Sequence, residues 1–498
     1  MGILKSNARY KRCDVGKNVV MLRRTKIVAT LGPRSNDEAS IKKLIQSGVN
    51  VFRLNFSHGN SDDHQKTAAL IRTISSALEI PIAILCDMQG PKIRIGGFKG
   101  DAQILLSAKQ RFRLDSELGE KDGHQHSVYM DRMYLDDLQK GDQLLLDDGR
   151  ISLEIERKQP NAVECIVLNG GALSGNKGVN KFGGGLSADV LTQKDRSDIG
   201  AAAALGTDYL AISFVHSKKD IEETRKLLAA AGSAAHIIAK IERAEAIREE
   251  NLPGIINSAD GLMVARGDLG VEIGDANLMA VQKQLIDAAN NANRVVITAT
   301  QMMESMITTP VPTRAEVFDV ANAVLDGTDA VMLSAETAVG KYPVETVQAM
   351  ARVIEGAEKY PLAQRSTHRI NETFARIDES VALATMYIAN HLEAVSAIIC
   401  MTKTGFTPLI MSRINSSMPI YAMAQKEGTS EITALYKGVF PIPFQTDSLP
   451  PQEIKSKAIE ILRKRGAVKR GDIVLITRGD IVDMGGSTNG LQVIRIEN

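Results

Sequence analysis

The sequence is poor in aromatic residues, in excess charge and in long apolar runs, and each scarcity excludes a class of protein. Tryptophan is absent and only 4% of the 498 residues are aromatic, so the base-stacking surfaces of single-strand-binding proteins are not expected. Lysine and arginine total 60 against 59 acidic residues, and the resulting net charge of +1 argues against a protein that coats nucleic acid. No run of about 18 apolar residues and no leader pattern occurs. We therefore expect a soluble, cytoplasmic protein that binds neither nucleic acid nor membrane.

Cysteine is also scarce, and its spacing is informative. The four cysteines stand singly, with no C-x-x-C pair, at positions 13, 86, 165 and 400. This arrangement excludes a disulfide framework and a zinc ribbon. We expect these thiols to be small core residues in a reducing compartment.

A repeating unit fills the first two thirds of the chain: a short β-branched run, a polar or glycine stop, and an amphipathic stretch. Eight such runs are predicted strands, at residues 25–31, 50–56, 80–87, 208–214, 236–242, 260–266, 294–300 and 328–334. The stretches between them carry apolar residues at intervals of three and four, which is typical of helices. Alternating strands and helices predict a parallel sheet, and eight strands favour a closed (β/α)8 TIM barrel over an open doubly wound sheet.

The alternation of strands and helices is interrupted between the third and fourth strands and changes again after about residue 364, and these two points divide the chain into domains. The third and fourth strands are separated by about 100 residues, far more than a βα connection needs, and short alternating runs within them predict an inserted small β-barrel domain. We expect residues 1–24 to be an N-terminal tail and residues 25–91 and 188–364 to form the barrel domain. Residues 92–187 would form a β-rich lid at the barrel mouth, and residues 365–498 a C-terminal α/β domain.

Reactive side chains gather at the carboxyl ends of the predicted strands, where the catalytic groups of such barrels lie. They are Arg53, Asn55, Asp87, Lys240, Glu242, Asp268 and Thr300. Residues two apart on a strand share a face, so Arg53 and Asn55 should point together, as should Lys240 and Glu242. An ion-pair network that closes the barrel would explain any one pair, but it explains poorly why nearly every polar residue falls at the same end.

The types of these residues indicate the chemistry. Glu242 and Asp268 offer two oxygen ligands, which suit Mg²⁺ because that ion keeps waters and takes further ligands from substrate oxygens. Two carboxylates do not distinguish Mg²⁺ from Mn²⁺. Lys240 can neutralise a migrating phosphoryl group or an enolate, and Arg53 offers a planar fork for phosphate or carboxylate. The set predicts phosphoryl-transfer or enolate chemistry, and neither a P-loop nor a G-x-G-x-x-G fingerprint is present.

At these positions the sequence resembles the pyruvate kinase family, from about residue 25 to the C-terminus. The matching blocks are KIVATLGP at 26–33, FRLNFSHG at 52–59, CDMQGPKIR at 86–94, AKIE at 239–242, ARGDLG at 265–270, TATQMM at 298–303 and SAET at 334–337. The resemblance implies a barrel domain, an inserted β-rich domain and a C-terminal effector domain, usually assembled as a homotetramer. It also implies the transfer of phosphate from phosphoenolpyruvate to ADP, giving enolpyruvate and then pyruvate plus ATP in glycolysis.

Matching positions in the barrel carry the family's roles for substrate and metal. Glu242 and Asp268 resemble the divalent-metal ligands, Lys240 the lysine on the transferring phosphoryl group, and Arg53 the arginine on the substrate phosphate. The substrate carboxylate would be held by backbone at the start of the ARGDLG block and by Thr300, which is also linked to protonation of the enolate. The implied substrate-binding set is Arg53, Lys240, Ala265, Arg266, Gly267, Asp268 and Thr300.

Four further positions resemble nucleotide contacts: Asn55, His58, Arg94 and Lys177. Lys177 belongs to the inserted domain, so the resemblance implies that the lid closes over ADP. No nucleotide-binding fingerprint supports these assignments independently, and they depend on the resemblance alone.

One departure from the family concerns potassium. Many members carry glutamate where this sequence has Lys92, and they require K⁺, for which the implied ligands are Asn55, Ser57, Asp87 and the carbonyl of Met88. An ammonium that reaches this neighbourhood would supply a fixed positive charge and make a free cation redundant. We therefore expect that K⁺ is not required. The alternative is that Lys92 points to solvent and the ion site persists.

A second departure lies in the C-terminal domain. A strand is followed by a loop that resembles the family's activator-phosphate loop and comprises Thr402, Lys403, Thr404, Gly405, Phe406 and Thr407. Its hydroxyls, its lysine and its backbone N–H groups suit a phosphate monoester. Phe406 stands where some relatives carry arginine, so we expect activation by a sugar monophosphate or AMP rather than a bisphosphate. The alternative is a loop without a physiological effector.

Two other functions remain open from the sequence. A Mg²⁺-dependent carbon–carbon lyase acting on pyruvate or phosphoenolpyruvate would share Arg53, Glu242 and Asp268, but it would not need Lys177 or ADP. A non-enzymatic metabolite sensor would use the C-terminal pocket and have a decayed barrel. The intact set of Lys240, Glu242, Asp268 and Thr300 argues against such decay.

Overall fold

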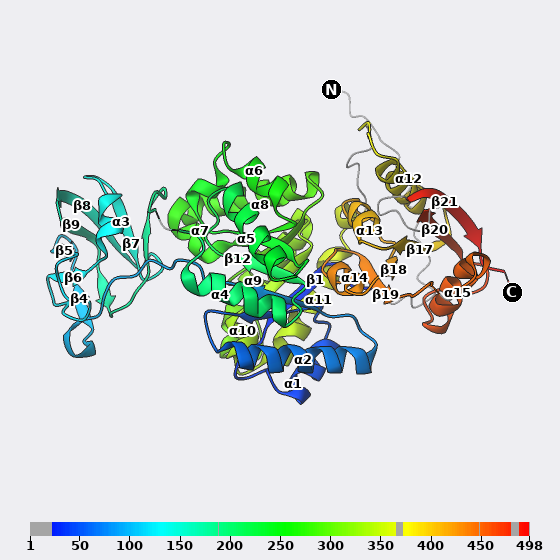
Figure 1. The fold of residues 1–498 in the computed structure, drawn as a ribbon, viewed down its shortest axis with the longest axis horizontal. Helices are drawn as coiled ribbons and strands as arrows, with labels where there is room; N and C mark the ends of the chain where they lie inside the picture. The colour runs from blue at the N-terminus through cyan, green and yellow to red at the C-terminus, as the bar shows by residue number, and fades with distance from the viewer. Residues whose placement is uncertain (1–21, 188, 365–371, 448, 480–487, 498) are drawn as a thin grey trace, which may run out of the picture.

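The computed structural model describes residues 22–187, 189–364, 372–447, 449–479 and 488–497 (Figure 1). Residues 1–21, which make up most of the predicted N-terminal tail and include Cys13, lie outside this range. The other three cysteines are free and buried. Within the described part of the chain, no helix has the length and apolar character needed to cross a membrane.

The eight predicted strands form a closed parallel barrel, which excludes the open sheet. They are β1 (Lys26–Thr30), β2 (Val51–Asn55), β3 (Ala83–Asp87), β12 (Tyr209–Ile212), β13 (His236–Ile241), β14 (Gly261–Ala265), β15 (Val295–Ala299) and β16 (Ala330–Leu333). Their order around the barrel is β1-β16-β15-β14-β13-β12-β3-β2, so that β1 pairs with both β2 and β16. Figure 1 shows the barrel at the centre of the molecule.

The barrel helices cover the outside of the sheet. They are α1 (Glu38–Gln46), α2 (Ser61–Leu78), α4 (Gln193–Ala204), α5 (Lys218–Ala230), α6 (Leu252–Ser258), α7 (Arg266–Ile273), α8 (Asp275–Asn291), α9 (Arg314–Asp326), α10 (Ala335–Ala338) and α11 (Pro343–Glu358). Alternate strand residues serve two cores: Leu262 and Val264 belong to the core between strands and helices, whereas Met263 belongs to the core inside the barrel. Because both faces of the strands are buried, the strand segments are almost continuously apolar.

The insertion between β3 and β12 has its own apolar core, and its strands are joined into two sheets. Its elements are β4 (Ile104–Leu106), β5 (Arg111–Asp115), β6 (Ser127–Tyr129), α3 (Arg132–Asp136), β7 (Gln143–Leu146), β8 (Ile151–Gln159), β9 (Ala162–Asn169), β10 (Gly171–Leu173) and β11 (Val179–Lys181). A six-stranded sheet has the order β11-β7-β8-β9-β5-β6, and β10 pairs with β4. Figure 1 places this domain at one end of the molecule, on the far side of the barrel from the C-terminal domain.

The C-terminal domain is an α/β domain, as predicted. It contains α12 (Ile377–His391), β17 (Val395–Thr402), α13 (Phe406–Ser412), β18 (Ile420–Ala424), α14 (Thr429–Thr433), β19 (Val439–Pro443), α15 (Pro451–Lys464), β20 (Ile473–Gly479) and β21 (Thr488–Arg495). The sheet order is β19-β18-β17-β20-β21, and only the β20–β21 pair among these described strands is antiparallel.

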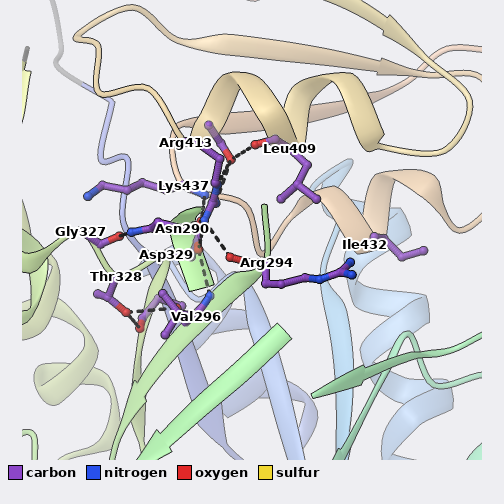
Figure 2. A network of polar contacts seen from close by, with 12 residues as sticks. Asn290, Arg294, Val296, Gly327, Thr328, Asp329, Leu409, Arg413, Ile432 and Lys437 are labelled. Carbon is purple, nitrogen blue, oxygen red and sulfur yellow. Dashed lines mark hydrogen bonds and ion pairs between the residues drawn. The ribbon is translucent and has the colours of Figure 1, made fainter. Parts of the chain in front are cut away.

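The C-terminal domain packs on the amino ends of the barrel strands through a buried polar network (Figure 2). Arg413, which follows α13, pairs with Asp329 at the start of β16, and neither side chain is more than 1% exposed. Arg413 also donates to Asn290 Oδ1 at 2.6 Å and to the carbonyl of Arg294 at 2.9 Å. The backbone N–H of Lys437 donates to Asp329 at 3.0 Å. This contact fixes the C-terminal domain at the barrel floor and leaves the opposite end, where the reactive residues gather, free for chemistry.

Candidate active site

Asp87 bridges the two cations that the sequence analysis placed at the carboxyl ends of the strands. Its Oδ2 accepts from Arg53 Nε at 2.7 Å, and its Oδ1 lies 3.1 Å from Lys240 Nζ. Arg53 is further held by Thr30, whose hydroxyl accepts from Nη1 at 3.0 Å. Burial raises the pKa of Asp87, but Lys240 and Arg53 outweigh it and lower the pKa below its ordinary value. Asp87 is therefore an anion that aligns two cations.

Lys240 is the centre of this cluster. Its ammonium lies 3.0 Å from Glu242 Oε1 and donates to the hydroxyl of Ser213 at 2.6 Å, in addition to its contact with Asp87. Burial lowers the pKa of Lys240, but the carboxylates of Asp87 and Glu242 outweigh it and raise the pKa above its ordinary value. Lys240 is consequently a fixed, buried cation. Lys240 near the end of β13 and Glu242 just beyond it are in contact, as their i, i+2 spacing predicted.

Glu242 is held from a second direction by backbone. Its Oε2 accepts from the N–H of Phe214 at 2.7 Å, and Phe214 has a positive φ of 56°. The pKa of Glu242 is raised, first by burial and, after the opposing effect of Lys240, by the negative charge of Asp268. The two carboxylates therefore repel each other across the opening.

The residues present fit a divalent cation. A cation between Glu242 and Asp268 would relieve their repulsion, and Asp268 keeps 28% of its side chain exposed for ligands from solvent or substrate. No group of three metal-ligating side chains occurs among the described residues, so a bound ion would take most of its ligands from water and substrate. That is the coordination Mg²⁺ prefers in phosphoryl-transfer sites.

The start of α7 carries Asp268 and brings the predicted carboxylate-binding backbone against Thr300. The N–H of Gly267 donates to Thr300 Oγ1 at 2.9 Å. Thr300 has a φ of +68°, an unfavourable conformation for a β-branched residue that costs about 1–3 kcal/mol. The Arg266 side chain stabilises this turn, because it donates to the carbonyl of Thr300 at 2.6 Å and pairs with Asp319 at 2.7 Å. The side chain of Arg266 is therefore engaged elsewhere, and Ala265 has only a methyl group, so both residues can contact a ligand at the helix start through their backbone alone.

The residues assigned to potassium are placed on both sides of Asp87. Asn55 pairs in register with Asp87 across β2 and β3, and its Oδ1 accepts from the N–H of exposed Ser57 at 3.1 Å. The carbonyl of Met88 accepts from the hydroxyl of Ser213 at 2.8 Å. Lys92 lies elsewhere: its ammonium is 4.0 Å from Asp268, and among the described ion pairs it has none with Asp87. Its fixed charge therefore lies on the side of the proposed divalent cation.

The predicted nucleotide contacts are divided between the barrel and the inserted domain. His58 is exposed in the loop after β2, and its carbonyl contacts His64 at 2.9 Å. In the inserted domain, Arg94 donates to the carbonyl of Asn176 at 2.7 Å. The neighbouring Lys177 pairs with Asp147 at 2.6 Å. Arg94 and Lys177 therefore lie close together on the inserted domain, as a shared ligand would require.

The predicted effector loop is a compact turn between β17 and α13. The N–H of Gly405 donates to Thr402 Oγ1 at 2.9 Å, and the hydroxyl of Thr429 donates to the carbonyl of Lys403 at 2.8 Å. The ring of Phe406 faces the guanidinium of Arg376, which lies 4.6 Å from the ring centre. A guanidinium from another element therefore stands beside the position where some relatives carry arginine.

Sequence reasoning missed three residues that hold the site in place: Thr30, Ser213 and Asp319. Ser213 joins Lys240 to the carbonyl of Met88, and its position directly after the fourth strand is a signal that could have identified it. Asp319 lies in α9, far in sequence from the Arg266 side chain that it holds, and no local pattern marks it.

Comparisons with known proteins identify the family that this chain resembles. Residues 22–347 match the family described as "Pyruvate kinase, barrel domain", and residues 379–494 match "Pyruvate kinase, alpha/beta domain". A protein of Salmonella typhimurium named pyruvate kinase II is 51% identical over 479 residues, covering 96% of this chain and 99% of that protein. A pyruvate kinase of Buchnera aphidicola subsp. Schizaphis graminum is 52% identical over 477 residues, covering 95% of this chain and 99% of its own. The crystal structure of a Cryptosporidium parvum pyruvate kinase superimposes with a TM-score of 0.88 at 32% identity, covering 95% of this chain and 96% of that one.

Proposed function

The chain belongs to the pyruvate kinase family and is a phosphotransferase, and from that premise we propose how its residues move a phosphoryl group from phosphoenolpyruvate to ADP. The observation that carries the proposal is the cluster in which Asp87 and Glu242 hold the Lys240 ammonium beside Arg53. Two aligned cations at the open end of the barrel suit a small, strongly anionic substrate.

Lys240 and Arg53 would bind the phosphoryl group. Lys240 stays charged because two buried carboxylates surround it, so it can neutralise oxygens of the migrating group without a change in protonation. Arg53 presents a guanidinium whose Nε is already occupied by Asp87, which orients its remaining N–H groups. Both cations are positioned before substrate arrives, so little reorganisation is needed during transfer.

Glu242 and Asp268 would hold the divalent cation. When bound there, Mg²⁺ or Mn²⁺ would neutralise charge on phosphoryl and enolate oxygens. The backbone of Ala265, Arg266 and Gly267 would bind the substrate carboxylate at the start of α7. Thr300, whose hydroxyl accepts a hydrogen bond from the Gly267 N–H, would take part in protonation of the enolate that phosphoryl transfer leaves behind.

ADP would lie between the barrel and the inserted domain. Asn55 and His58 would contact it from the barrel, and Arg94 and Lys177 from the inserted domain acting as a lid. The proximity of Arg94 and Lys177 supports this assignment, because the carbonyl that Arg94 holds belongs to Asn176, the residue before Lys177. Substitution of Lys177 by methionine should raise the KM for ADP more than that for phosphoenolpyruvate.

We also propose that the enzyme does not require K⁺. The ammonium of Lys92 lies 4.0 Å from Asp268 and adds a permanent positive charge at the rim of the site. Pyruvate formation should therefore be equal with and without K⁺ at matched ionic strength, whereas Lys92→Glu should make activity depend on K⁺. A strict K⁺ requirement of the unaltered enzyme would contradict the role of Lys92 and leave the kinase assignment intact.

The C-terminal loop would bind a phosphorylated activator, a sugar monophosphate or AMP. The hydroxyls and backbone N–H groups of the loop of residues 402–407 support a single phosphate site, beside which Arg376 stacks on Phe406 and pairs with Asp378 at 2.7 Å. We further propose a cytoplasmic homotetramer, on the family resemblance. Activation curves with AMP, a sugar monophosphate and a sugar bisphosphate would identify the ligand, and a flat response to all three would contradict regulation at this loop.

The first test is pyruvate and ATP formation from phosphoenolpyruvate, ADP and Mg²⁺. Stoichiometric formation of both products is expected. Turnover of phosphoenolpyruvate without ATP would indicate the lyase, and Mg²⁺ binding without turnover, even with effectors, would indicate the sensor.

A further inference from the structure

We propose that Glu272 is a positioning residue that ties the returning strand of the lid to the metal- and substrate-binding end of the barrel. The inference rests on the proposed lid function of residues 92–187. Glu272 lies in the last turn of α7, one helical turn beyond Asp268, and is only 1% exposed. A buried carboxylate is costly unless it is fully paired, so its partners show what it holds.

On the lid side, Glu272 binds the chain through both its side chain and its backbone. Asn180 in β11 donates its amide to Glu272 Oε1 at 3.2 Å. Three residues later, the N–H of Gly183 donates to the Glu272 carbonyl at 2.9 Å. The segment that leaves the lid is therefore attached to α7 at two points.

On the barrel side, the same carboxylate binds the residues that directly follow Glu242. The N–H of Ala244 donates to Glu272 Oε2 at 2.8 Å, and Arg243 Nε lies 3.2 Å from Oε1. Arg243 is itself buried and donates to the carbonyl of Leu186, again on the returning lid segment, at 2.7 Å. Glu272 thus connects three parts of the protein: the chain that follows Glu242, the helix α7 that carries Asp268, and the lid.

The connection that these contacts hold has little rigidity of its own. Gly183, Gly184 and Gly185 have positive φ values of 80°, 79° and 96°, a conformation that other residues rarely adopt. A Cβ at Gly184 would lie only 2.4–2.7 Å from the carboxylate of Glu245, which also accepts from the N–H of Gly185. Three successive glycines restrict the backbone less than other residues would, and the carboxylates of Glu272 and Glu245 hold this connection in place.

The anchor lies close in sequence to the lid lysine assigned to ADP. Lys177 precedes Asn180 by three residues and forms an ion pair with Asp147. Asp147 begins a loop that approaches α7 at Gly149: a Cβ added to Gly149 would lie 3.8 Å from the side chain of Val271. A shift of β11 relative to α7 would therefore move Lys177 relative to the barrel. In the proposed function phosphoenolpyruvate would be bound by barrel residues alone, so loss of the anchor should affect ADP selectively.

The test measures both substrates on the full-length enzyme carrying Glu272→Gln, Asn180→Ala, or both. Each single substitution should raise the KM for ADP about three- to tenfold, as expected for the loss of one ordinary hydrogen bond, while the KM for phosphoenolpyruvate stays within about twofold. The double variant should be no worse than Glu272→Gln, because Asn180 acts through Glu272. Hydrogen exchange at residues 179–187 should become faster in all three variants.

Glu222→Gln, an exposed glutamate on α5, is the matched control and should change neither KM. Asn180→Ala keeps the experiment informative if Glu272→Gln fails to fold, because it leaves the Arg243–Glu272 pair intact. Equal increases in both KM values, multiplying effects in the double variant, or unchanged exchange at residues 179–187 would overturn the proposal. Failure of the unaltered enzyme to form pyruvate would instead overturn the proposed function, and the exchange measurement would still test the anchor.

Discussion

Removing Arg413 should loosen the attachment of the C-terminal domain to the barrel floor (Figure 2). The Arg413 side chain is 1% exposed and its partner Asp329 is fully buried. Replacement by methionine keeps most of the volume but leaves a buried carboxylate without its counter-charge. Asp329 would keep only hydrogen bonds from the backbone N–H groups of Val296 and Lys437, at 2.9 and 3.0 Å.

The expected loss of stability follows from the removal of one partner of a buried ion pair while the other stays charged. Breaking a buried ion pair on one side costs about 3–5 kcal/mol, and the upper end applies here because Asn290 and the Arg294 carbonyl also lose their donor. For a chain of 498 residues the unfolding entropy is about 1 kcal/mol per kelvin, so the expected decrease in Tm is about 5 °C. Adding Asp329→Asn to Arg413→Met should recover part of the loss, since the amide carries no charge to be left unpaired.

Scanning calorimetry combined with hydrogen exchange at Phe406–Ser412 and Ala330–Leu333 would measure the effect on both sides of the contact. Lys464→Met is the control, because its ion pair with Glu460, at 2.7 Å, is exposed, and its loss should change Tm negligibly. An unchanged Tm for Arg413→Met would refute the reasoning. A double variant less stable than Arg413→Met alone would refute the attribution to an unpaired charge.

Three further predictions concern the active site and the barrel floor. Thr300→Ala should lower kcat about 10²-fold, whereas Thr300→Ser, which keeps the hydroxyl, should retain most activity; equal losses in pyruvate assays would contradict a role of the hydroxyl. Lys240→Met should lower kcat about 10²–10³-fold, and unchanged turnover would remove Lys240 from the phosphoryl site. Burial lowers the pKa of Lys26 to about 7 in the folded protein, so the unfolded chain binds the ammonium proton of Lys26 more tightly. The stability that Lys26 contributes therefore declines as the pH falls from about 10 towards 7. Lys26→Met should remove this decline from the urea midpoint, and parallel pH profiles of variant and parent would count against it.

Much of the active site was predictable because of where its residues stand on their strands. Parallel strands of a closed barrel end at one face, so polar residues at strand ends must converge whatever their distance in sequence. Lys240 and Glu242 share a face by their spacing alone, and they are in contact at 3.0 Å. The pairing of Arg53 with Asp87 was not predictable in detail, because it depends on side-chain directions across two strands.

Lys92 shows the limit of positional reasoning. Its place in the GPKIR block brings it to the active site, but the direction of its side chain depends on how the chain leaves β3 for the inserted domain. Its ammonium lies beside Asp268, on the side of the opening where we propose the divalent cation. Ser213 was missed for a related reason: a serine at a strand end is common, and only its contact with Lys240 distinguishes it.

The barrel, its interruption by a β-rich insertion, the C-terminal α/β domain and the set of reactive residues were all predictable from the sequence. These follow from periodicity and strand-end position, which are local properties of the chain. The pairing of residues distant in sequence was visible only in the folded protein. Arg413 pairs with Asp329, and Glu272 pairs with Arg243 and accepts a hydrogen bond from Asn180 of the lid. Such pairs join elements whose relative placement depends on packing of whole domains, and no short-range pattern in the sequence specifies that packing.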